Sequence, residues 1–168
     1  TIVDKRDPTS DTRSSDVGEV ARSIAEELEL ERRDVDTAGF AGMLKNLGTL
    51  FDAEKSIIAS ANLLMGIDFE GPVVETIRQA EERFDGKGPQ GLGGEDILLT
   101  ARVVAVAAAF VELTCPRDGG SGLTLEEATA RLLQESGTVF DRRVVSALLN
   151  HLENHGGAIK WAHFLRRN

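Results

Sequence analysis

Residues 97–113 form a run of mostly aliphatic side chains that, wound as a helix, is apolar around nearly its whole circumference. A helix at the surface of a globular protein is apolar along one stripe, whereas a helix that is apolar all round must be covered on every side. We therefore expect this segment to be a central, fully packed helix. The rest of the chain must then supply the elements that surround it.

Those surrounding elements are predicted to be helices as well. Apolar residues recur at intervals of three and four along most of the chain, which is the spacing of one helix face, and no run alternates with the period of two that is typical of a strand. The predicted apolar stripes lie within residues 17–28, 43–51, 57–64, 72–80, 128–133, 144–152 and 158–167. The pattern predicts an all-α protein, a single compact bundle of about eight helices.

Capping residues mark several of the predicted helix boundaries. Residues that suit an N-cap or a first helical position stand at Ser14 or Ser15, Asp36 or Thr37, Pro72, Thr124 and Asp141. Glu127 follows Thr124 at the spacing of a capping box. Gly156 and Gly157 suit the end of the helix that starts after Asp141. The stretches 84–96 and 115–122 are expected to be flexible loops.

Length and charge narrow the class of protein. The chain of 168 residues fits one domain, residues 1–168, and its formal net charge is −9. Because that charge repels phosphate backbones and anionic headgroups on average, nucleic acids and membranes are not expected partners. No apolar run reaches the length of a membrane span. The single cysteine, Cys115, excludes an intrachain disulfide and suits a reducing compartment, so we expect a cytoplasmic protein. Because the chain starts at Thr1 without Met, we also expect it to be part of a longer protein.

Several consecutive segments resemble a known family in their order and spacing. They are the glycine-dense loop 82–96, the aliphatic helix 97–114 and the segments 123–128 and 137–145. Together they resemble the second half of an HD-GYP domain, a helical module of bacterial signal transduction that hydrolyses cyclic di-GMP. Residues 4–17 and 41–50 are similar to the first half of that domain. The resemblance implies an HD-domain-like fold. In this family such a domain is usually attached after a receiver or sensor domain in the same chain, as in a response regulator.

The metal-binding residues of that family are not matched in the first half of the chain. The name-giving His-Asp pair falls on Lys45 and Asn46, and an earlier histidine falls on Arg13. A protonated lysine or arginine repels a divalent cation, and an asparagine oxygen is only a weak neutral ligand.

The second half of the chain departs from the family in the same way. The family's His-His-Glu segment falls on Ala80, Glu81 and Glu82, and two acids of its central helix fall on Ala108 and Val111. In such enzymes the metals activate water and neutralise the phosphodiester. The departures imply no bound metal and no cofactor. We therefore expect a pseudoenzyme, a catalytically inactive regulatory domain that contacts a protein partner or binds cyclic di-GMP without hydrolysing it, with a homodimer as a further possibility.

The candidate ligand-binding residues fall on the family's site or its loop and carry donors for an anion. They are Arg13, Lys45, Asn46, Arg83 and Lys87. Two alternatives stay open. The first is a metal-dependent phosphodiesterase acting on cyclic di-GMP with a rebuilt site, using Glu81, Glu82, Asp85, Glu95 or Asp96. The second is a relative that keeps only the helical scaffold, such as an HDOD domain.

Three other features favour structural roles. Residues 86–91 spell G-x-G-x-x-G, but a helix precedes them where a dinucleotide site needs a strand, and Pro89 lacks an amide donor. His151 and His155 are four residues apart on one helix face, and we interpret them as a solvated pair, with a bound metal as the alternative. Cys115 is expected to be a spectator thiol.

Overall fold

The computed structural model describes residues 8–45, 71–116 and 120–165, and all the structural statements below concern these ranges. In chain order their α-helices are α1 (Pro8–Glu27), α2 (Arg32–Leu44), α4 (Val73–Gln79), α5 (Leu99–Thr114), α6 (Leu125–Gln134), α7 (Arg142–Asn154), α8 (Gly157–Lys160) and α9 (Ala162–Leu165), and a 3-10 turn, η4 (Gly94–Asp96), precedes α5. No strand occurs in these ranges; Ser136 and Phe140 form only an isolated bridge. The predicted all-α bundle is confirmed.

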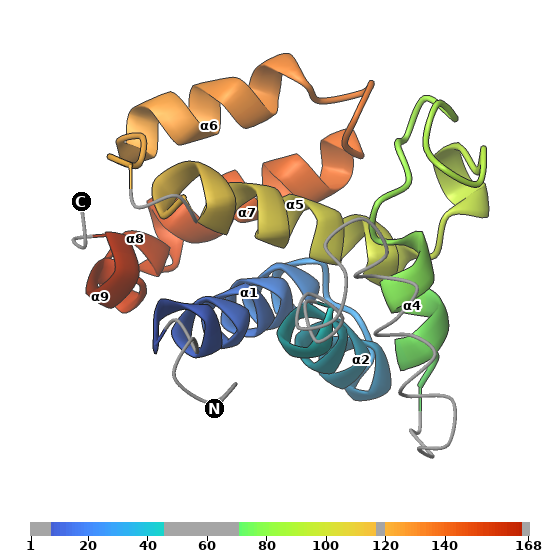
Figure 1. The fold of residues 1–168 in the computed structure, drawn as a ribbon, viewed down its shortest axis with the longest axis horizontal. Coiled ribbons are helices and arrows are strands. Elements are labelled where there is room, and N and C mark those ends of the chain that lie inside the picture. Colours follow the sequence, from blue (N-terminus) through green and yellow to red (C-terminus); the bar gives the residue numbers. More distant parts are fainter. Residues whose placement is uncertain (1–7, 46–70, 117–119, 166–168) are drawn as a thin grey trace, which may run out of the picture.

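Helix α5 lies at the centre of the bundle, with α6 on one side and α1 and α2 on the other (Figure 1). It contacts α1, α2, α4, α6 and α7. Along α5 the side chains of Val103, Val104 and Phe110 are fully buried. The prediction of a central helix is confirmed, but not that of complete packing, because Ala105, Ala108 and Ala109 remain half-buried along one face.

Helices α1 and α2 cross at close range because three glycines lie at their contact. A Cβ built on Gly18 of α1 would lie 2.8 Å from the carbonyl oxygen of Gly39 in α2. A Cβ built on Gly42 would lie 3.0 Å from the Cα of Gly18. Real Cβ atoms essentially never approach backbone as closely as 2.8 Å, and 3.0 Å is tighter than nearly all real contacts. The close crossing therefore depends on the absence of side chains at these glycines. This contact fixes the position of α2 relative to α1, and both helices pack against α5.

Aromatic side chains close the core near the C-terminal end of the chain. The ring centroid of Phe110 lies 5.8 Å from that of Trp161 and 6.5 Å from that of Phe164. All three side chains are fully buried. They hold the short helices α8 and α9 against the end of α5, in the part drawn red in Figure 1.

The local capping predictions are confirmed in the second half of the chain. Thr124 and Glu127 form a reciprocal capping box, and Asp141 accepts a hydrogen bond from the Arg143 backbone N–H at 2.8 Å. Gly156 adopts a left-handed φ of 74° just after α7, a conformation in which glycine is not penalised.

Other predicted boundaries are wrong. Helix α1 starts at Pro8 and not after Ser14 or Ser15, which agrees with the preference for proline in a first helical turn. Helix α2 starts at Arg32 and not near Asp36. The single helix predicted within 158–167 is instead two short helices in the described residues, Gly157–Lys160 and Ala162–Leu165, separated at the fully buried Trp161. The predicted stripe at 57–64 lies outside the described residues.

No helix in the described ranges combines the length and the apolarity that crossing a bilayer requires.

Candidate functional site

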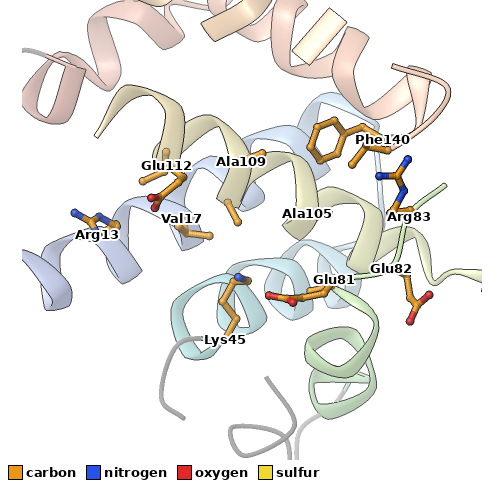
Figure 2. Close-up of a pocket in the computed structure, with 14 residues that line it drawn as sticks. Arg13, Val17, Lys45, Glu81, Glu82, Arg83, Ala105, Ala109, Glu112 and Phe140 are labelled. Atoms are coloured by element: carbon orange, nitrogen blue, oxygen red, sulfur yellow. The ribbon is translucent and has the colours of Figure 1, made fainter. Parts of the chain in front are cut away.

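A cavity of about 510 Å³ opens beside α5, which is within the usual size range of small-molecule sites. The N-terminal half of α1, the end of α2, the segment after α4 and the turn before α7 surround it (Figure 2). Its lining residues are Arg13, Val17, Lys45, Ala80, Glu81, Glu82, Arg83, Ala105, Ala108, Ala109, Val111, Glu112, Val139 and Phe140. The half-buried alanine face of α5 forms one wall, because small side chains there leave space unfilled.

Arg13 reaches this cavity from α1. Its side chain is buried, with an exposed fraction of 7%. The Nη2 group donates a hydrogen bond to the carbonyl oxygen of Pro116 at 3.1 Å, but the Nε–H is buried without a hydrogen-bond partner. A buried donor that lacks an acceptor is destabilising by about 1–3 kcal/mol, and more when it is charged. An acceptor brought by a ligand would remove that penalty.

Lys45 occupies the C-cap position of α2, where the positive charge is favourable next to the helix's carbonyl end. Its side chain is buried, with an exposed fraction of 8%. In Figure 2 its ammonium group and the carboxylate of Glu81 point toward one another across the cavity. The second buried cation of the site therefore comes from a different helix than Arg13.

Glu82 stabilises the glycine loop. Its Oε1 accepts a hydrogen bond from the backbone N–H of Gln90 at 2.7 Å, and the Gln90 side chain donates to the carbonyl oxygen of Arg78 at 2.9 Å. Its Oε2 is buried without a hydrogen-bond partner. In Figure 2 the Glu82 carboxylate points away from the carboxylates of Glu81 and Glu112. The three glutamates of the cavity are therefore not gathered around one point.

Arg83 is held at the rim by its neighbour Asp85. The guanidinium donates two hydrogen bonds to that carboxylate, at 3.0 and 2.7 Å. These bonds, together with the Lys87 backbone N–H, lower the pKa of Asp85 to about 2 although desolvation opposes the shift. The backbone N–H groups of Phe84 and Asp85 donate to the carbonyl oxygens of Val139 and Thr138. The start of the loop is thus fixed by hydrogen bonds, contrary to the expected flexibility.

A buried ion pair lies next to the cavity, between α5 and the start of α7. Arg102 of α5 donates to Asp141 at 2.7 Å, and the exposed fractions of the two side chains are 8% and 3%. Burial raises the pKa of Asp141, but the backbone N–H of Arg143 and the Arg102 guanidinium outweigh burial and hold that pKa below its ordinary value. The pair ties α5 to the start of α7 and so fixes the turn carrying Val139 and Phe140.

The structure brings Arg13, Lys45 and Arg83 to one cavity, although they are far apart in the sequence. Lys87 is exposed in the glycine loop and is not part of the lining, and Asn46 lies outside the described residues. Of the acids in the alternative proposal, only Glu81 and Glu82 line the cavity.

The remaining acids of that proposal lie elsewhere. Asp85 pairs with Arg83, and Glu95 and Asp96 are exposed in η4.

Sequence reasoning missed one charged member of the lining, Glu112. It follows Ala108 by one helical turn, and that i,i+4 spacing was the available signal. Among the residues that the structure describes, the lining contains three bases and three acids but no histidine; the three histidines of the sequence are His151, His155 and His163.

Comparison with known proteins points to one family. A family model described as an HD domain matches residues 49–144. The chain is 48% identical over 69 residues to the cyclic di-GMP phosphodiesterase response regulator RpfG of Xanthomonas campestris, covering 40% of this chain and 18% of that protein. It is 30% identical over 147 residues to the cyclic di-GMP phosphodiesterase PA4108 of Pseudomonas aeruginosa, covering 76% of this chain and 35% of that protein.

The fold itself is shared with a solved structure. A solved structure described as an HDG"Y"P protein from Bdellovibrio bacteriovorus superposes with a TM-score of 0.74 at 19% identity, covering 89% of this chain and 54% of that one. The chain therefore spans about half of this structural relative and less of the two curated relatives. These similarities agree with the resemblance drawn from the glycine loop and the aliphatic helix.

Proposed function

Because the chain belongs to the HD domain family, we propose that it acts in cyclic di-GMP signalling as a regulatory domain that binds the dinucleotide without hydrolysing it. The two curated relatives named above are described as phosphodiesterases of cyclic di-GMP, which supports the choice of ligand. The observation that carries the proposal is the buried Arg13 guanidinium, whose Nε–H lacks an acceptor at the edge of a cavity of about 510 Å³.

The lining residues do not fit the metal centre that the family resemblance implies. Transition metals in such sites are held by imidazole nitrogens and carboxylates, and this lining offers no imidazole. Among the lining positions that resemble the family's ligand positions, Arg13 and Lys45 repel a divalent cation and Ala108 has no donor atom. Glu81 and Glu82 carry carboxylates at such positions, but these two carboxylates point away from one another (Figure 2). The proposed binding therefore involves no metal.

The same side chains suit a phosphodiester. A guanidinium and an ammonium that are both buried, on two different helices, form stronger bonds to a phosphate oxygen than exposed side chains would. The Nε–H of Arg13 supplies a donor that the protein itself does not use. Glu81 and Glu112 are exposed, so water screens their repulsion of the ligand more than it screens the attraction of the buried bases. The buried Glu82 carboxylate is turned to the glycine loop, where it accepts a hydrogen bond from the Gln90 N–H.

A ligand in this cavity would contact α1, α2 and the turn before α7 together. Ligand binding would favour one arrangement of α1, α2 and this turn over others. An attached domain or a protein partner that contacts these elements could bind that arrangement selectively. We propose that an upstream receiver or sensor domain is such a partner, since one relative is described as a response regulator.

Titration calorimetry with cyclic di-GMP tests the binding proposal. We expect one ligand per chain, and we expect Arg13→Gln and Lys45→Gln each to weaken binding about tenfold to hundredfold, the value of a hydrogen bond to a charged group. Arg32→Gln is the matched control, because it removes the same charge from an exposed position on α2. Absence of binding by the unaltered chain, or equal loss in the control variant, contradicts the proposal.

The second candidate function is a phosphodiesterase with a rebuilt metal site. Three carboxylates, those of Glu81, Glu82 and Glu112, line the same cavity, which is the observation in its favour. Incubation of the chain with cyclic di-GMP and manganese or iron separates the two candidates. Turnover that a chelator abolishes, and that Glu81→Gln reduces, would establish the enzyme and reject the non-hydrolytic proposal.

A further inference from the structure

A second cluster of side chains, separate from the cavity, joins the end of α1 to α7. Glu27 is the last residue of α1, and its Oε2 lies 3.5 Å from Nδ1 of His151 and 2.7 Å from Nδ1 of His155. One donor atom from each of the three side chains lies within 4.8 Å of the other two. The prediction that both histidines are exposed to solvent is correct only for His155. His151 is buried, and its ring centroid lies 5.1 Å from that of Trp161.

We propose that Glu27, His151 and His155 form a binding site for a divalent transition metal, with zinc as the preferred ion. Imidazole nitrogen and carboxylate oxygen are the donors that zinc takes from protein side chains other than cysteine. Tetrahedral zinc with bonds of about 2.0–2.1 Å places its ligand atoms about 3.4 Å apart. The separation of Glu27 and His151 already has this value, at 3.5 Å. To reach this geometry, the exposed His155 ring would move away from Glu27 by less than an ångström, and the donor atoms of His151 and His155, which lie within 4.8 Å of one another, would settle at the same spacing.

The surroundings prepare the carboxylate for this role. The side-chain amide of Asn150 donates to Oε1 of Glu27, which leaves Oε2 directed at the two histidines. Burial raises the pKa of Glu27, but hydrogen bonds from His155 and Asn150 outweigh it, so that the pKa lies below its ordinary value. An ionised, oriented carboxylate is the form that binds a metal, and such second contacts are typical of metal sites.

His151 offers one usable nitrogen. Its Nε2 is buried and has no hydrogen-bond partner, so the polar contact of this ring is at Nδ1, facing Glu27. His155 is 57% exposed in its side chain, which gives an ion a path from solvent. Three protein ligands leave the fourth position of a tetrahedral ion for water or for a ligand from a partner.

Such an ion would clamp two helices that are far apart in the sequence. Glu27 and His155 are separated by 128 positions, and the histidines lie against the aromatic cluster that closes the core. Metal binding would therefore raise the stability of the whole bundle, because it links the first helix to the last long one. The proposal is independent of cyclic di-GMP binding, since the two sites share no residue.

Zinc binding by the full chain tests the proposal. After removal of metal with a chelator, titration with zinc chloride in competition with a chromophoric chelator should give one zinc per chain. Glu27→Gln and His155→Ala should each weaken binding by at least about 10–100-fold. His163→Ala is the matched control, since it removes an exposed histidine on α9 that contacts Asp16 at 3.3 Å. His151 is left unchanged because its burial would confound binding with folding.

Two further measurements distinguish a specific zinc site from nonspecific zinc binding. The melting temperature of the unaltered chain and of His163→Ala should rise with zinc, whereas that of Glu27→Gln should not. Cobalt in the site should give the intense visible absorption of a tetrahedral ion. Less than one zinc per chain, or an equal loss of affinity in His163→Ala, would overturn the proposal and leave a hydrogen-bonded Glu-His pair.

Discussion

Replacing Arg102 with methionine removes the cation from the buried pair behind the cavity and keeps a side chain of similar length. The Asp141 carboxylate, 3% exposed, would then remain buried without its main partner. Removing one member of a buried ion pair is destabilising by about 3–5 kcal/mol. We expect the lower end, about 3 kcal/mol, because the Arg143 backbone N–H still donates to Asp141 at 2.8 Å.

The pH dependence of this loss of stability follows from the direction in which the pKa of Asp141 is shifted. The pKa of Asp141 in the folded chain lies below its ordinary value of 3.8. A carboxyl group shifted in this direction stabilises the fold above its unfolded pKa, and the contribution is lost as the pH falls through the folded pKa. The difference between the unaltered chain and Arg102→Met should therefore be full at neutral pH and should narrow as the pH falls below about 4.

Urea unfolding followed by circular dichroism measures the free energy of unfolding for each variant. Arg143→Gln is the control, because this exposed side chain lies 3.5 Å from the same carboxylate and should contribute less than about 1 kcal/mol. The reasoning is refuted if Arg102→Met loses no more stability than Arg143→Gln, or if its loss grows toward acid pH.

Three further predictions concern the helix crossing, a cap and the cavity. Gly18→Leu should lower the free energy of unfolding by at least about 1–3 kcal/mol in urea melts, because its Cβ would lie 2.8 Å from the Gly39 carbonyl oxygen, and an unchanged value would contradict the close crossing. Thr124→Ala should be destabilising by about 1 kcal/mol through loss of the capping box, whereas Glu127→Gln, which keeps the side-chain acceptor, should change little in the same assay. Ala108→Leu places a larger side chain in the cavity wall, where it would obstruct the ligand. Calorimetry should then show cyclic di-GMP binding that is weaker by at least roughly tenfold, while the melting temperature of the variant stays unchanged. Unaltered affinity would mean that the ligand binds elsewhere.

Some features of this protein were open to prediction because they depend on neighbours in the chain. The capping box at Thr124, the N-cap at Asp141 and the left-handed Gly156 each involve residues within a few positions of one another. The start of α1 was missed because Ser14 and Ser15 are good capping residues and Pro8 is an equally good first-turn residue. Local preference does not choose between two suitable positions.

The site was only partly open to prediction. The family resemblance selected Arg13, Lys45 and Arg83, and the structure places all three at one cavity. It did not select Glu112, which becomes a wall residue because the alanines of the same helix leave that face unfilled. Lys87 is close to Arg83 in the sequence, but the chain between them passes through Gly86 with a left-handed φ of 79°, and Lys87 is exposed and outside the lining.

By itself the amino-acid sequence determined the helical class, the central position of residues 97–113 and the caps at Thr124, Asp141 and Gly156, because each follows from the period of the apolar residues or from bonds within one turn. The tertiary structure alone decided that Arg102 pairs with Asp141, that Glu27 meets His151, and that Gly18 lies against Gly39 and Gly42. Those partners are separated by many residues in the chain. Their contact depends on how whole helices pack around α5, and packing is a property of the assembled bundle that no local pattern contains.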